Sequence, residues 1–155
     1  MNEEQIIEGI IQIISAIIGS LGFSMLFCLK GKKLLWATLG GGIAWSVYLV
    51  VQVLGGGLFL CGVVSAMVAT AYSEIFARIL KTPKTAFIFP AIVPMVPGGG
   101  LYYTMSNALS KNFDKALKYA SDTLSTAIAL AFGIVVVIMF VKVVKHLKKK
   151  KHPEK

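Results

Sequence analysis

Long apolar runs, separated by short clusters of lysine and arginine, are the feature that most limits how this chain can fold. A run of about 20 apolar residues can cross the roughly 30 Å hydrocarbon core of a membrane as a helix. Such runs occupy residues 6–29, 34–54, 58–77, 85–105 and 121–141. The hydrophobic share of the chain is 56%, which exceeds the roughly 45–50% of a soluble domain. We therefore predict an all-α integral membrane protein with five transmembrane segments and a single membrane domain over residues 1–155.

The fourth run, residues 85–105, differs from the others because it contains helix-breaking residues. Each proline lacks a backbone N–H and clashes with the preceding turn, and glycine frees the backbone. Irregular backbone persists at membrane depth only where protein surrounds it or where it lines a wet cavity. We predict that this segment is either kinked or fully broken. The residues responsible are Pro90, Pro94, Pro97, Gly98, Gly99 and Gly100.

The basic residues predict the orientation of the chain, because lysine and arginine concentrate on the cytoplasmic side. With five crossings and an external N-terminus, the cytoplasmic side receives three basic residues in each of the first two clusters and seven in the tail 142–155. Only Lys111, Lys115 and Lys118 are then external. A re-entrant fourth segment would place the tail opposite the first two clusters. We predict an N-terminus outside and a C-terminus in the cytoplasm, and we do not attribute the net charge of +9 to nucleic-acid binding.

The sequence gives little support to an enzyme or a metalloprotein. No nucleophile occurs together with a base and an orienting group, and the glycine clusters at 40–42 and 55–57 lack the Lys-Ser/Thr of a phosphate-binding loop. Cys28 and Cys61 fall within apolar runs, with no His or Cys at metal-ligand spacing. We expect buried free thiols and no cofactor.

Charged and aromatic side chains supply the candidate functional residues. Glu74 and Arg78 are spaced i, i+4 and can pair on one helix face. Two interpretations of Glu74 stay open: a structural ion pair with Arg78, or a role in handling substrate or protons. Asp122 is expected at the N-terminus of the fifth segment, after a short surface helix over residues 107–118. Tyr102 and Tyr103 directly follow the glycines and could present a hydroxyl to a polar solute. The remaining rings are expected at the membrane interfaces: Trp36, Trp45 and Tyr48.

Small residues at four-residue spacing predict faces where helices approach closely. Such stripes occur in four of the five runs: Ser15 and Gly19; Gly40 and Ala44; Gly62, Ala66 and Thr70; Ser121, Ser125, Ala129 and Gly133. The sequence does not say which of these faces a partner chain.

Two stretches resemble the threonine/serine exporter family, and in particular its small five-crossing subunit of the ThrE/YjjB type. They are Tyr72-Ser-Glu-Ile-Phe-Ala-Arg78 and Phe89-Pro-Ala-Ile-Val-Pro-Met-Val-Pro-Gly-Gly-Gly-Leu-Tyr-Tyr103, with Thr82-Pro83 between them. The resemblance implies an inner-membrane secondary exporter of small polar metabolites, either threonine and serine or dicarboxylates such as succinate, driven by the proton gradient. It also implies that the chain corresponds to the C-terminal half of longer members. A separate larger subunit, a homo-oligomer, or both are therefore expected as partners.

The residues and the resemblance converge on a transport hypothesis. The substrate carboxylate would dock on the N–H groups of Gly98–Gly100, Tyr102 or Tyr103 would donate a hydrogen bond, and Glu74 would exchange protons or meet an ammonium group. In the alternative, the chain is a non-transporting assembly or scaffold subunit. The proline-glycine break then only permits helix packing, and Glu74 forms a structural ion pair with Arg78.

Overall fold

A computed structural model of the chain describes residues 3–151. Within this range the chain forms six α-helices and one short 3-10 helix: α1 (Glu3–Leu26), α2 (Lys32–Val53), α3 (Leu58–Ile79), α4 (Thr85–Ile92), η1 (Val93–Met95), α5 (Gly98–Leu109) and α6 (Phe113–Lys151). Four of these helices, namely α1, α2, α3 and α6, are long and apolar enough to cross a membrane. The all-α prediction is confirmed for this range, whereas the fifth crossing and the orientation stay predictions. The ends of the predicted domain and tail, residues 1–2 and 152–155, lie outside the described residues.

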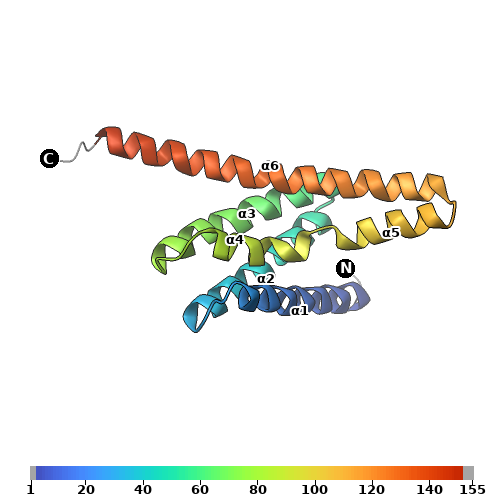
Figure 1. Ribbon diagram of the computed structural model, residues 1–155, viewed down its shortest axis with the longest axis horizontal. Helices are drawn as coiled ribbons and strands as arrows, with labels where there is room; N and C mark the ends of the chain where they lie inside the picture. Colours follow the sequence, from blue (N-terminus) through green and yellow to red (C-terminus); the bar gives the residue numbers. More distant parts are fainter. Residues whose placement is uncertain (1–2, 152–155) are drawn as a thin grey trace.

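The helices run back and forth along the long axis of the molecule (Figure 1). α1 begins at the end where α2 turns into α3 and α5 turns into α6. α6 finishes at the opposite end, where α1 turns into α2 and α3 turns into α4. α2 packs against α1, α3 and α4, whereas α6 packs against α3 and α5.

The predicted break in the fourth segment is present. α4 and η1 form one piece, α5 forms the other, and the two are bent by 47° at Val96 and Pro97. A 3-10 turn over Val93–Met95 precedes the bend, because prolines at 94 and 97 remove the donors that would continue an α-helix. Of the two alternatives left open by the sequence, a simple kink or a full break, the structure has the break.

Four helices end in the same way, with a residue in the left-handed region and a bond from the next N–H to a carbonyl five residues back. At the end of α5, Lys111 has φ 57° and the N–H of Asn112 donates to the carbonyl of Asn107. This Schellman arrangement favours glycine, because a Cβ crowds the backbone there. Only α2 uses glycine at this position; the four residues are Cys28, Gly55, Lys81 and Lys111. Cys28 is exposed in this turn, so its predicted burial is wrong, whereas Cys61 is buried as expected.

The stretch between α5 and α6 differs from the prediction. Instead of a short surface helix over 107–118, α5 runs to Leu109 and α6 begins at Phe113. No proline or glycine interrupts residues 113–132, so one helix continues through Asp122, which lies well inside α6 rather than at its start. At about 1.5 Å per residue, the 39 residues of α6 extend roughly 58 Å, well beyond a hydrocarbon core of about 30 Å.

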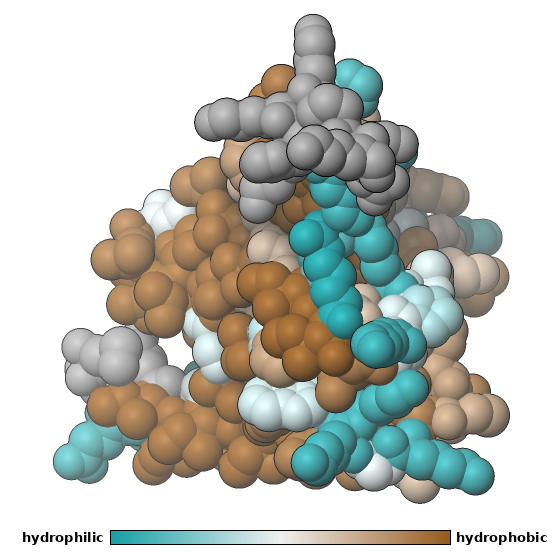
Figure 2. All heavy atoms as spheres, turned by 90° about the vertical axis from the view of Figure 1, so that its left-hand side faces the viewer, coloured by the Kyte–Doolittle hydropathy of each residue, from teal (hydrophilic) through white to brown (hydrophobic). Residues whose placement is uncertain are grey.

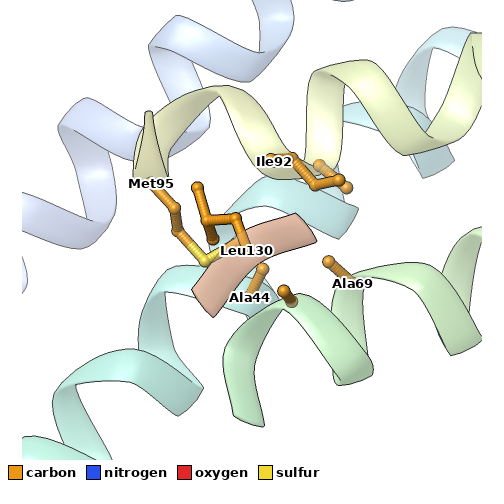
Figure 3. Close-up of a cluster of buried hydrophobic side chains, with 7 residues drawn as sticks. Ala44, Ala69, Ile92, Met95 and Leu130 are labelled. Atoms are coloured by element: carbon orange, nitrogen blue, oxygen red, sulfur yellow. The ribbon is translucent and has the colours of Figure 1, made fainter. Parts of the chain in front are cut away.

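The core lies where the broken segment meets α2, α3 and α6. Figure 3 shows Met95 and Ile92 lying beside Ala44, Ala69 and Leu130. Three predicted small-residue stripes contribute buried residues to helix contacts, whereas Gly19 of the α1 stripe has open space around it. On α6, Gly133 lies so close to α3 that an added Cβ would be 2.6 Å from the carbonyl oxygen of Val63.

Candidate functional site at the broken helix

The carbonyl group of Pro90 is satisfied by a residue from another helix. In a regular helix this carbonyl would accept a bond from the N–H of residue 94, but Pro94 has none. The Ser20 hydroxyl of α1 donates to the Pro90 oxygen instead, at 2.8 Å, and the side chains of both residues are fully buried. Leaving this buried carbonyl without a donor would cost about 1–3 kcal/mol. Ser20 therefore makes the break tolerable.

Three consecutive glycines of α2 allow the neighbouring helices to approach this point. A Cβ on Gly41 would overlap the Ser20 hydroxyl and would lie 3.2 Å from the Pro90 oxygen. A Cβ on Gly40 would lie 2.9 Å from the Tyr72 ring of α3, and one on Gly42 would lie 2.7 Å from Ile17 of α1. The sequence predicted packing only for Gly40. The triplet in fact brings α2 against α1, α3 and α4 at one level.

A cavity of about 280 Å³ lies beside the break, between α1, α2 and η1. Its walls carry no charged side chain but include the amide of Gln12 and the hydroxyl of Ser15; the latter donates to the Ile11 carbonyl at 2.8 Å. The lining residues are Ile11, Gln12, Ser15, Ala16, Trp45 and Pro94. Small-molecule sites have this character, with apolar walls and a few polar groups.

Trp45 has a feature that helix packing leaves unexplained. Its indole Nε1 is buried and has no hydrogen-bond acceptor within residues 3–151, although buried polar groups are usually paired. The ring stacks on Tyr48, with centroids 5.0 Å apart. Trp45 lies near the middle of α2 and lines the same cavity as Pro94, so its predicted place at a membrane interface is wrong. Its position in the middle of the run 34–54 was the signal available in the sequence.

The glycines and tyrosines predicted as a docking site lie on the other side of the break. Gly98 and Gly99 are exposed with open space around them, whereas Gly100 packs against Thr123 of α6. Tyr102 and Tyr103 are exposed at the surface of α5, and Tyr103 stacks on Tyr119 of α6 with centroids 5.3 Å apart. Pro97 caps the start of α5.

Glu74 is buried near the end of α3 and pairs with two cations. The Arg78 guanidinium donates to Oε2 at 3.1 Å, and Lys84 donates to Oε1. The pairing with Arg78 agrees with the structural alternative drawn from the i, i+4 spacing. Lys84 was missed, because it follows the turn after α3 and only the folded chain brings it back. Burial lowers the pKa of the Lys84 ammonium, and the charges of Lys145 and Lys142 lower it further.

The structure does not bring Glu74 and the glycines into one site. Lys84, which contacts Glu74, precedes α4, and Gly98 begins α5 after the whole of α4 and η1. At about 1.5 Å per residue, the intervening stretch separates them by on the order of 15–20 Å. The hypothesis that Glu74 and the N–H groups of Gly98–Gly100 contact one small substrate together therefore does not fit this arrangement. Their individual roles stay predictions.

Apolar helices long enough to span a membrane, with a broken segment in their midst, define a multi-pass membrane protein, and an uncharged cavity lies at the break. The comparisons agree with this assignment. The family described as "Threonine/Serine exporter, ThrE" matches residues 12–140. The chain therefore belongs to the threonine/serine exporter family, as its motifs predicted. Searches of curated proteins and of solved structures gave no match.

Proposed function

We propose that the chain is a subunit of a secondary exporter that carries small polar metabolites across the inner membrane. The family membership supports an exporter, and the cavity at the broken helix is the observation that carries the proposal. Discontinuous helices are a recurring way to place unwound backbone and helix ends beside a substrate.

We propose five crossings with the N-terminus outside. The broken segment starts at the end of the molecule where α6 finishes and leads to the opposite end (Figure 1). Both pieces together therefore extend along the same axis as the four long helices. This arrangement supports a crossing made of two half-helices rather than a re-entrant loop.

Threonine and serine are the proposed substrates, with dicarboxylates such as succinate second. The cavity is lined by an indole, an amide and a hydroxyl but by no cation. A zwitterion with no net charge suits such walls better than a dianion, because an uncompensated charge in an apolar environment is costly. Trp45 Nε1 is buried in this conformation, so the substrate hydroxyl or carboxylate would accept a hydrogen bond from it once the indole ring turns into the cavity.

A larger subunit, a second copy of this chain, or both would complete the exporter. In support of a partner, α1 leaves most of its surface uncovered, including Gly19 and Gly22. The alternative of a scaffold subunit draws support from Glu74, whose two oxygens are already paired with Arg78 and Lys84.

Efflux of preloaded serine, threonine and succinate tests the proposal, first from cells expressing this chain alone and then with the larger subunit. The variant Trp45→Phe keeps a ring but removes the N–H, and Trp36→Phe is its matched control because Trp36 only stacks on Phe76 and offers its backbone carbonyl to Tyr72. We expect Trp45→Phe to reduce amino-acid efflux at unchanged expression and Trp36→Phe to leave it unchanged. Equal efflux in both variants would reject the cavity as the substrate site. Absence of efflux in every combination would favour the scaffold.

A further inference from the structure

A second cavity lies at the end of the molecule where α3 and α6 meet. Its volume is about 130 Å³, and it is lined by Arg78 and Lys145 together with Phe140, Val141 and Val144. Two cations thus stand beside three apolar side chains, at the point of α6 where the apolar run gives way to lysines. This composition differs from that of the uncharged cavity at the broken helix.

Within residues 3–151, the positive charge around this cavity exceeds the negative charge available to balance it. The two ion pairs found within residues 3–151 both use Glu74, with Arg78 and Lys84 as partners. Lys142 and Lys145 are exposed and close enough to Lys84 for their charges to act on it. Figure 2 shows hydrophilic residues forming a band across this end of the molecule, directly beside apolar surface. In this part of the described chain, Glu74 pairs with Arg78 and Lys84, and two further cations, Lys142 and Lys145, lie close to Lys84.

We propose that this cavity binds the phosphate of an anionic membrane phospholipid, with Arg78 and Lys145 contacting the phosphate and an acyl chain lying along Phe140 and Val141. The guanidinium of Arg78 has donors left after its bond to Glu74, and its fork geometry suits phosphate oxygens. Basic pockets between helices on the cytoplasmic side are a known form of lipid site.

The apolar walls distinguish a lipid from a free phosphate ion. Phe140, Val141 and Val144 offer nothing to a small hydrated anion, but they bury hydrocarbon if the ligand carries an acyl chain. The position of the cavity beside the apolar belt of α6 also gives a lipid direct access from the bilayer. Neither feature would be needed to hold inorganic phosphate.

The test is a titration of the full chain in neutral detergent, followed by the midpoint of thermal unfolding. Short-chain phosphatidylglycerol, short-chain phosphatidylcholine and inorganic phosphate are the three probes. We expect saturable stabilisation by phosphatidylglycerol and little by the other two. If inorganic phosphate stabilises as strongly at the same concentration, the lipid assignment is wrong; if phosphatidylglycerol does not stabilise at all, the site is wrong.

The variant Lys145→Gln removes one charge from the cavity, and Lys32→Gln removes one charge from an exposed lysine in another cluster at the same end. Both side chains are outside the described ion pairs, so both variants should fold. We expect the apparent Kd for phosphatidylglycerol to rise about fivefold in Lys145→Gln, from the usual contribution of one basic residue near a membrane surface, and to stay within twofold in Lys32→Gln. An equal rise in both variants would mean that the lipid responds to total charge, and the defined site would be rejected. A second wall variant, Val144→Glu, should weaken binding further, and unchanged binding there would also reject the site.

Discussion

The Ser20 hydroxyl lies 2.8 Å from the carbonyl oxygen of Pro90, 70 residues further along the chain. The bond joins α1 to the broken segment at the carbonyl left without a donor by Pro94. It shows how a helix rich in proline is held at membrane depth: the first helix supplies the donor, and a glycine on α2 leaves room for it. A polar residue within an apolar run thus has a structural role here.

Replacing Ser20 by alanine should destabilise the fold, because the Pro90 carbonyl would stay buried without a donor. We expect a loss of about 1–3 kcal/mol, the usual cost of an unsatisfied buried group. Unfolding of the purified protein in detergent would measure it. The control is Ser24→Ala, since the Ser24 hydroxyl donates only to the Ser20 carbonyl within its own helix, at 2.7 Å. Equal losses in the two variants would contradict the special role of Ser20.

Gly41→Ala should be among the most damaging single changes in the chain. The new methyl group would overlap the Ser20 hydroxyl and crowd the Pro90 oxygen, which is backbone and cannot move aside. Overpacking of this kind typically costs about 1–3 kcal/mol or more. The yield of monodisperse protein and the midpoint of thermal unfolding are the readouts. Gly19→Ala, where the methyl group meets nothing, should cost no stability in the isolated chain and should gain up to about 1 kcal/mol from the higher helix propensity of alanine.

The ion pairs of Glu74 predict that a triple variant lacking Glu74 and both cations is more stable than the double variant lacking only the cations. Removing both partners, in Arg78→Gln with Lys84→Gln, leaves a buried carboxylate without a cation, and breaking a buried pair in this way costs about 3–5 kcal/mol. Because both cations are partly exposed, we expect the lower end of that range. Adding Glu74→Gln should then restore stability in part. A triple variant less stable than the double variant would show that Glu74 does not depend on these cations.

The same residue separates the transport and scaffold functions. Glu74→Gln should lower the yield of the assembled complex if Glu74 is purely structural. If Glu74 instead handles protons or substrate, assembly should survive and efflux should be lost. Complex yield and efflux, measured on the same preparation, distinguish the two outcomes.

Lys111→Gly should stabilise the turn between α5 and α6. Lys111 has φ 57°, a conformation that a residue with a Cβ adopts at a cost and glycine adopts freely. We expect a gain of up to about 1 kcal/mol, reduced by the greater freedom of glycine in the unfolded chain. The neighbouring Ser110 has φ −77°, so Ser110→Gly should bring no gain. The two midpoints of thermal unfolding give the comparison.

The sequence predicted the features that depend on local chemistry. Apolar run lengths located the four long helices to within a few residues, except at α6, and the prolines at 90, 94 and 97 located the break. It could not reveal contacts set by the fold, such as Lys84 on Glu74 or Ser20 on Pro90, because their spacing has no local periodicity. The prediction that Asp122 lies at the start of a helix is wrong, because it treated the polar residues before Asp122 as a separate helix. In the structure one uninterrupted helix continues through them.

The extensive packing of α5 is with α6 alone, and α6 meets the remaining helices chiefly through α3. The glycine triplet, by contrast, fixes α2 to α1, α3 and α4. Because Gly133 locks α6 to α3 and Leu130 belongs to the core, the part of the molecule outside the interlocked helices is α5 alone, joined to them at Val96 and Pro97. A displacement of α5 along α6 would bend the chain next to Pro94 while leaving the interlocked helices at rest.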